Sequence, residues 1–111
     1  MTSATDPVED RIAALADPTR RLLLDRLSVR DEATASVLAG ELPISRQAIV
    51  KHLSVLDRVG LVGSRREGRE RRYWVRPRPL VQTAQWMNQV ASQWMARLTA
   101  IKALAESPDE G

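Results

Sequence analysis

The sequence predicts a mainly α-helical fold with a small β-hairpin and one long C-terminal helix. Over most of the chain, apolar residues recur at intervals of three and four, which is typical of amphipathic helices. Residues 61–76 instead alternate on either side of a glycine-containing turn, as the two strands of a hairpin do. Residues 80–106 contain no glycine or proline, so a single helix can run through all of them.

Two helices are expected in the first thirty residues, with a break between them. Ile12 and Leu15 lie three apart on one face of the first helix. Asp17 and Pro18 then form a helix-start signature, because aspartate caps free N–H groups and proline at the first helical position needs no N–H partner. The apolar stripe of the second helix consists of Leu23, Leu24 and Leu27.

A short third helix and a longer fourth helix follow, joined by the tight turn "PIS". Thr34 and Ser45 stand where each helix would begin, and both residue types are favoured caps. Leu38 and Leu42 share a face of the third helix. The fourth helix carries one apolar stripe, formed by Ile49, Leu53 and Leu56. Gly60 follows it at a position where helices often end in a left-handed conformation.

The hairpin is expected to consist of "LVGSRR" and "RRYWVR", joined by the turn "EGRE". Alternation puts Tyr73 and Val75 on one face of the second strand. The opposite face of that strand would carry Arg72, Trp74 and Arg76. Two helices joined by a short turn and followed by such a ribbon make a winged helix-turn-helix.

The long C-terminal helix carries an apolar heptad repeat about 40 Å long, at roughly 1.5 Å per residue. One row is Leu80, Met87, Trp94 and Ile101, and its companion row is Ala84, Ala91, Leu98 and Ala105. A small domain cannot cover such a stripe, so the sequence predicts a homodimer interface that includes Leu80, Met87, Trp94, Leu98 and Ile101. The competing interpretation is an apolar effector pocket at Trp86, Met87, Trp94 and Met95. A membrane-surface helix is disfavoured because the polar face is rich in glutamine and serine rather than lysine.

These elements fit a single domain of 111 residues. We expect a flexible N-terminus at residues 1–7, a winged DNA-binding domain at 8–78, a dimerisation helix at 79–106 and a flexible tail at 107–111. No apolar run approaches the roughly 18 residues that a membrane span needs, and the N-terminus does not resemble a signal peptide. A cytoplasmic protein is therefore expected.

Positive charge is concentrated in one part of the chain. Residues 45–78 carry ten basic and three acidic side chains, a balance of +7, whereas residues 1–32 carry five basic and seven acidic ones, a balance of −2. Such polarity on a folded domain is typical of nucleic-acid binding. The candidate wing contacts to DNA are Arg65, Arg66, Arg69, Arg71 and Arg72. The alternative is a solvated hairpin that Glu67 and Glu70 partly neutralise.

The fourth helix is predicted to be the recognition helix, since an α-helix fits the major groove of DNA. Arg46, Gln47 and Val50 are the candidate base readers, because arginine pairs with guanine, glutamine pairs with adenine, and an apolar group meets the thymine methyl. Lys51 and Ser54 are expected to touch base edges or phosphates. Ser45, at the helix start, is expected to contact phosphate.

Cysteine is absent and His52 is the only histidine, so disulfides, thiolate ligands and a conventional zinc site are not expected. His52 is interpreted as a hydrogen-bonded structural residue rather than a catalytic one. No catalytic triad spacing or glycine-rich phosphate loop occurs. The sequence therefore predicts a protein that is not an enzyme and that has no metal and no cofactor.

Three blocks, "ALADPTRRLLLDRL", "LPISRQAIVKHLSVLDRVGLV" and "REGRERRYWV", resemble the motifs of the ArsR family of prokaryotic transcriptional repressors. The resemblance covers roughly residues 10–77. It implies a homodimer that binds a palindromic operator in double-stranded DNA, often at its own promoter. Metal-sensing members carry paired cysteines where this chain has Thr34 and Ser36, and the last helix lacks the family's aspartate and histidine ligands. The chain thus resembles the metal-independent, autorepressor-like branch.

The sequence leaves two rival functions open. One is a winged-helix protein-interaction module that has lost DNA binding, which the basic and glutamine side chains at positions 46, 47 and 51 disfavour. The other is a regulator that binds a small apolar effector, of unknown identity, between tryptophan-rich helices.

Overall fold

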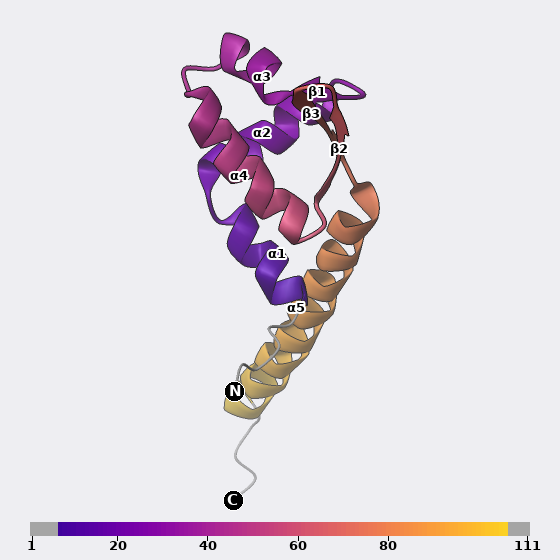
Figure 1. Ribbon diagram of the computed structural model, residues 1–111. Helices are drawn as coiled ribbons and strands as arrows, with labels where there is room; N and C mark the ends of the chain where they lie inside the picture. The colour runs from indigo at the N-terminus through magenta and orange to yellow at the C-terminus, as the bar shows by residue number, and fades with distance from the viewer. Residues whose placement is uncertain (1–6, 107–111) are drawn as a thin grey trace, which may run out of the picture.

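A computed structural model describes residues 7–106 of the chain (Figure 1). Its elements are, in order, α1 (Pro7–Leu15), α2 (Pro18–Ser28), β1 (Ala33–Thr34), α3 (Ala35–Glu41), α4 (Arg46–Arg58), β2 (Val62–Glu67), β3 (Glu70–Val75) and α5 (Pro77–Glu106). The predicted helical fold with a small hairpin is confirmed. Pro7, which was included in the expected flexible N-terminus 1–7, belongs to α1. Residues 1–6 and the expected tail 107–111 lie outside the described residues.

Three helices begin at the predicted caps. The side chains of Asp17, Thr34 and Ser45 each accept a hydrogen bond from a backbone N–H of the first helical turn, at 2.7, 3.2 and 3.1 Å. The backbone N–H of Arg20 also donates to Asp17, and this bond is the main cause that lowers the pKa of the Asp17 carboxyl. Each cap satisfies N–H groups that have no partner within the helix.

The core lies between α2, α3, α4 and the sheet. Its fully buried large side chains are those of Leu23, Leu27, Leu38, Ile49, Leu53, Leu56, Leu61 and Val62. The predicted stripes of α2, α3 and α4 therefore meet one another, because the apolar residues at intervals of three and four lie on the inward faces of these helices.

The sheet has three antiparallel strands in the order β1-β3-β2, one strand more than the predicted hairpin. Ala33 pairs with Tyr73 and Thr34 with Arg72. A strand of two residues shows no alternation pattern, so sequence reasoning missed it. Gly68 occupies the hairpin turn with a φ of 63°, a left-handed conformation that glycine adopts readily.

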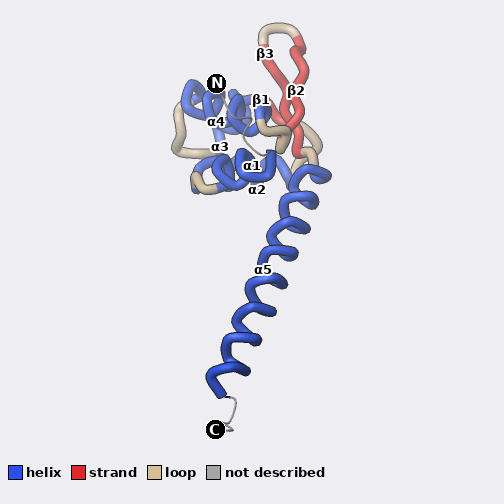
Figure 2. Tube along the Cα trace, turned by 90° about the horizontal axis from the view of Figure 1, so that it is seen from below, coloured by secondary structure: helices blue, strands red, loops and turns tan. Residues whose placement is uncertain are grey.

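Helix α5 begins at Pro77 rather than at the predicted residue 79, so the expected boundary between residues 78 and 79 falls within its first turn. Prolines at 77 and 79 are both tolerated there, since first-turn N–H groups need no helical partner. The helix extends away from the winged domain (Figure 2). Near its start, Arg11 of α1 holds it by donating to Gln82 Oε1 (3.4 Å) and to the Val59 carbonyl at the end of α4 (3.3 Å).

None of the helices in the described residues 7–106 is long and apolar enough to cross a membrane.

Replacing Gly63 with alanine is expected to destabilise the fold by about 1–3 kcal/mol, because overpacking forces side chains or backbone to move. An added Cβ would lie 2.6 Å from Cε2 and Nε1 of Trp74, on the paired strand. Urea denaturation at fixed protein concentration measures the change. Gly40→Ala is the matched control: it meets nothing within 4 Å in helix α3 and should stabilise by about 0.5–1 kcal/mol. Equal stabilities of the two variants would contradict the packing of Trp74 on Gly63.

Candidate nucleic-acid interface

Helix α4 presents a polar face because its apolar face is fully used in the core. Ile49, Leu53 and Leu56 are 0% exposed, which fixes the rotation of the helix about its axis. The predicted reader positions accordingly lie on the opposite side. Ser45, Arg46, Gln47, Lys51 and Ser54 are exposed, and Val50 is half-buried. The chain therefore displays a row of hydrogen-bonding side chains along a helix of suitable width for the major groove.

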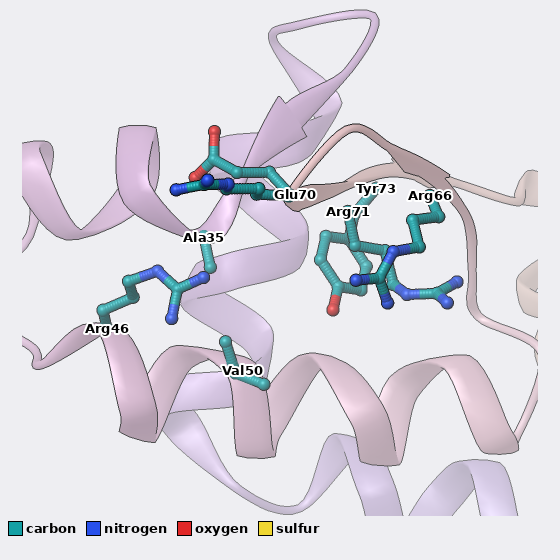
Figure 3. Close-up of a pocket in the computed structure, with 8 residues that line it drawn as sticks. Ala35, Arg46, Val50, Arg66, Glu70, Arg71 and Tyr73 are labelled. Carbon is teal, nitrogen blue, oxygen red and sulfur yellow. The ribbon is translucent and has the colours of Figure 1, made fainter.

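The wing, here meaning β2, β3 and their turn, lies beside this helix and encloses a cavity of about 180 Å³ with it (Figure 3). The lining residues are Ala35, Arg46, Val50, Arg66, Arg69, Glu70, Arg71 and Tyr73. In Figure 3, Arg46 and Val50 rise from α4, while Arg66, Arg71 and Tyr73 come from the wing. Four arginines against one glutamate make the cavity positively charged and suited to an anion.

A serine bridge connects the start of α4 to the wing through α3. Arg46 Nε donates to Ser36 Oγ at 3.1 Å, and the Ser36 hydroxyl donates to Glu70 Oε1 at 2.5 Å. One hydroxyl group thereby joins the consecutive helices α3 and α4 to β3, whose Glu70 is 34 residues from Ser36.

A second serine bridge connects the wing to the end of α4. Arg71 Nη1 donates to Ser64 Oγ at 3.0 Å, and the Ser64 hydroxyl donates to Asp57 Oδ2 at 2.6 Å. In both bridges a serine oxygen accepts from arginine while its proton goes to a carboxylate. The wing is thus attached near both ends of α4. Ser36, Ser64 and Asp57 were not among the predicted site residues, and no local sequence signal marks them.

Comparison with known proteins agrees with this arrangement. Residues 15–65 match a family model described as a helix-turn-helix domain. The HTH-type transcriptional regulator Rv2034 of Mycobacterium tuberculosis is 37% identical over 94 residues, covering 85% of this chain and 84% of its own. The transcriptional repressor SdpR of Bacillus subtilis is 34% identical over 74 residues, which cover 67% of this chain and 81% of the SdpR chain. A solved ArsR-like transcriptional regulator from Rhodococcus sp. RHA1 superposes with a TM-score of 0.81 at 43% identity, covering 92% of this chain and 95% of that one.

This chain belongs to the ArsR family of helix-turn-helix transcriptional regulators. The predicted family and the winged helix-turn-helix fold are both confirmed.

The five wing arginines of this ArsR-family protein divide by their partners. Arg65 forms a bidentate pair with Glu32, whose carboxyl pKa it lowers by hydrogen bonding, and its guanidinium lies 5.7 Å from the centre of the Trp74 ring. Arg72 Nε donates to Glu67 at 2.8 Å. Arg71 is held by Ser64, as described above.

Arg66 and Arg69 differ from the other three wing arginines. No residue between 7 and 106 forms a hydrogen bond or ion pair with the guanidinium group of either one. Both line the cavity and are exposed, so they are the wing cations most available to an external anion.

Tyr73 forms the floor between the wing and the core, and it is 4% exposed. Burial raises the pKa of its hydroxyl, since the ionised form would lose solvation. The hydroxyl therefore keeps its proton at neutral pH, and Figure 3 shows it on the side that faces α4. It can donate a hydrogen bond to an anion in the cavity.

The remaining polar candidates have structural partners. His52 is half-buried with Nδ1 3.5 Å from Arg20 Nη1, which fits its predicted structural role. Thr34 caps α3 and Ser36 forms the first serine bridge, so both positions at which metal-sensing ArsR proteins carry cysteines serve other contacts here. Within the described part of the chain, no group of three histidine, cysteine, aspartate or glutamate residues could hold a metal ion.

The second candidate surface is the apolar face of α5. Met87, Trp94, Leu98 and Ile101 are 55–62% exposed in the single chain, and Leu80 is 40% exposed. Part of this face forms an apolar groove of about 330 Å³ lined by Trp86, Met87, Val90, Ala91 and Trp94. The rest of the described chain leaves this face uncovered.

Arg69→Ala is expected to reduce the slope of log affinity against log salt by about 0.9, the loss of one phosphate contact on duplex DNA. Arg65→Ala should leave that slope unchanged and loosen the wing instead, because Glu32 already neutralises Arg65. Fluorescence anisotropy on one labelled duplex at several salt concentrations compares the two variants. A larger slope change for Arg65→Ala would show that the ion pair opens on DNA.

Proposed function

We propose that this protein is a metal-independent transcriptional repressor that binds a palindromic operator as a homodimer, including one at its own promoter. The observation that carries this proposal is the continuous surface formed by the polar face of α4 and the arginine-lined cavity beside it. A repressor of this kind works in the cytoplasm, where occupying a promoter excludes RNA polymerase. It needs no catalytic group and no cofactor.

Base recognition would come from the first half of α4. The exposed Gln47 can form a bidentate contact with adenine, and the half-buried Val50 can contact a thymine methyl group. Arg46 can pair with guanine. Lys51 and Ser54, one turn further along, would reach base edges or phosphates. The hydroxyl of Ser45 accepts the capping bond from Ala48, which leaves its proton for a phosphate oxygen.

Phosphate binding would come from the wing and the cavity. Arg69 lies in the hairpin turn, Arg66 and Arg71 face each other on the paired strands next to it, and Tyr73 lies two residues further from the turn. The guanidinium groups of Arg66 and Arg69 have no partner within residues 7–106. Contacts to phosphate set register and affinity without reading sequence, so wing and helix have separable effects.

Dimerisation would cover the apolar face of α5. Helix α1, which packs against α5, would contribute to the same interface. Each Å² of apolar surface that the partner helix covers would stabilise the dimer by about 25 cal/mol. Twofold pairing presents the same surface twice, and recognition helices about 34–36 Å apart would enter successive major grooves. Arg11 ties α5 to the end of α4, so the pairing geometry is transmitted to the recognition helices.

A second candidate function is regulation by a small apolar effector, favoured by the groove at Trp86 and Trp94. Trp86 and Trp94 line this groove, so their fluorescence reports on a compound bound there. An apolar compound that quenches or shifts this fluorescence and also changes operator affinity would establish an effector site. A dimer interface alone would give no such response.

The direct experiment is selection of bound sequences from a randomised duplex library, followed by footprinting on the promoter of the protein's own gene. A twofold-symmetric consensus that is protected at this promoter supports the proposed function. Enrichment of no consensus would contradict it.

Gln47→Ala is expected to lose about 1–3 kcal/mol of discrimination at one base pair in each half-site and to leave binding to other sequences nearly unchanged. Competition titrations with single-base-pair operator variants measure this loss. Gln89→Ala, an exposed glutamine on α5, is the matched control and should bind like the wild type. A uniform loss over all sequences would contradict base reading by Gln47.

Trp94→Asp is expected to convert the dimer to a monomer, since a carboxylate in a paired apolar seam would lose its solvation. Sedimentation velocity gives the mass, and circular dichroism checks that α5 remains helical. Gln89→Asp introduces the same charge on the opposite side of the helix and should remain dimeric. An unchanged mass for Trp94→Asp would rule out this seam.

A further inference from the structure

Among residues 7–106, Ser36 is the one exposed hydroxyl group whose hydrogen bonds connect the recognition helix, the helix before it and the wing. It lies at the second position of α3 and plays no part in capping that helix, because Thr34 does so. It accepts from Arg46 Nε and donates to the carboxylate of Glu70. Both hydrogen bonds lie on the exposed surface, outside the core. A substitution at Ser36 should therefore change DNA binding rather than the stability of the fold.

The contact with Ser36 leaves the recognition end of Arg46 open. Only Nε of the guanidinium is used, and no described residue accepts a hydrogen bond from either terminal nitrogen. These two terminal N–H₂ groups are the pair that can bind guanine O6 and N7 end-on. An arginine without support on its Nε side would sample many rotamers and would lose that freedom on binding.

Glu70 fixes the direction of the Ser36 hydroxyl. Its Oε1 accepts the hydrogen bond that the Ser36 hydroxyl donates at 2.5 Å, and this leaves a lone pair of Ser36 Oγ directed toward Arg46. Glu70 belongs to β3, so the position of the wing and the position of Arg46 are set together. The carboxylate also lies in the arginine-lined cavity, where it offsets part of the positive charge.

We propose that Ser36 is a specificity-determining positioning residue, which holds Arg46 so that its terminal nitrogens meet one base pair and which couples that contact to the wing through Glu70. This role rests on the proposed DNA-binding function. Ser36 itself touches no base.

The test is a double-mutant cycle on the full-length protein. Wild type, Ser36→Ala, Arg46→Ala and the double variant are titrated with the selected operator and with single-base-pair variants of it. The base pair whose preference disappears in Arg46→Ala is the one that Arg46 reads. At that base pair, Ser36→Ala should lower discrimination about three- to tenfold, the worth of one net hydrogen bond. In the Arg46→Ala background the same substitution should have no further effect.

Three further variants separate positioning from general stability. Ser36→Thr keeps the hydroxyl and should retain discrimination. Ser28→Ala removes another exposed serine hydroxyl, one that donates to the Asp25 carbonyl in α2, and should behave like the wild type. Glu70→Gln should raise affinity for all duplexes, because it removes a negative charge from the DNA-facing cavity, while Ser36→Ala should not.

The outcomes also distinguish this role from the underlying function. If Arg46→Ala loses one base-pair preference but Ser36→Ala discriminates like the wild type, the role of Ser36 is overturned and the repressor function stands. The role of Ser36 is likewise overturned if Ser36→Ala weakens all sequences equally, or if Arg46→Ala changes no preference while Gln47→Ala does. If the wild type shows no sequence preference, the proposed function is overturned and the role of Ser36 falls with it.

Discussion

The burial of one stripe of α4 determines the layout of the functional surface. Ile49, Leu53 and Leu56 are completely buried against the leucines of α2 and α3. Rotating the helix by one residue would expose such side chains at a cost of about 1.5–3 kcal/mol each. The opposite face therefore cannot turn inward, and the polar residues there are presented to a partner by the energetics of the core. Since the wing packs beside α4, its position follows from the same constraint.

The charges around α4 are arranged in two groups with different effects. Arg65 and Arg72 are neutralised within the hairpin and its neighbouring loop, so they stiffen the wing. Arg66 and Arg69 have no such partners in the described chain and keep their charge for an outside anion. Arg46 and Arg71 belong to neither group. Each is linked to a carboxylate only through the hydroxyl of a serine bridge. A count of arginines therefore overstates the charge available to DNA, whereas their partners show which of them are available.

Local sequence signals were enough to predict most of the fold. Caps at Asp17, Thr34 and Ser45, the glycine after α4 and the alternating hairpin all act within a few residues, where spacing is informative. The helices that they delimit were predicted for the same reason. The start of α5 was placed too late, because proline is equally compatible with the end of a strand and the first turn of a helix.

What could not be predicted depends on contacts between distant segments. Strand β1 forms because Ala33 pairs with Tyr73, forty residues away in the chain. Arg65 donates a hydrogen bond to Glu32, and Ser36 donates one to Glu70. These partners are 33 and 34 residues apart in the chain. No periodicity encodes such pairs. The sequence thus predicted helix α4 and the residues on its outward face, while the contacts that attach the wing and Arg46 required the three-dimensional structure.

Thiol protection tests most directly whether DNA covers the polar face of α4. The chain has no cysteine, so Gln47→Cys creates a single thiol on that face, and Asp25→Cys creates one on α2 beside the start of α5. Alkylation rates are measured with and without the selected duplex. Strong protection of the thiol at position 47 by DNA, with an unchanged rate at position 25, is the predicted result. Equal rates at position 47 with and without bound duplex would contradict the account.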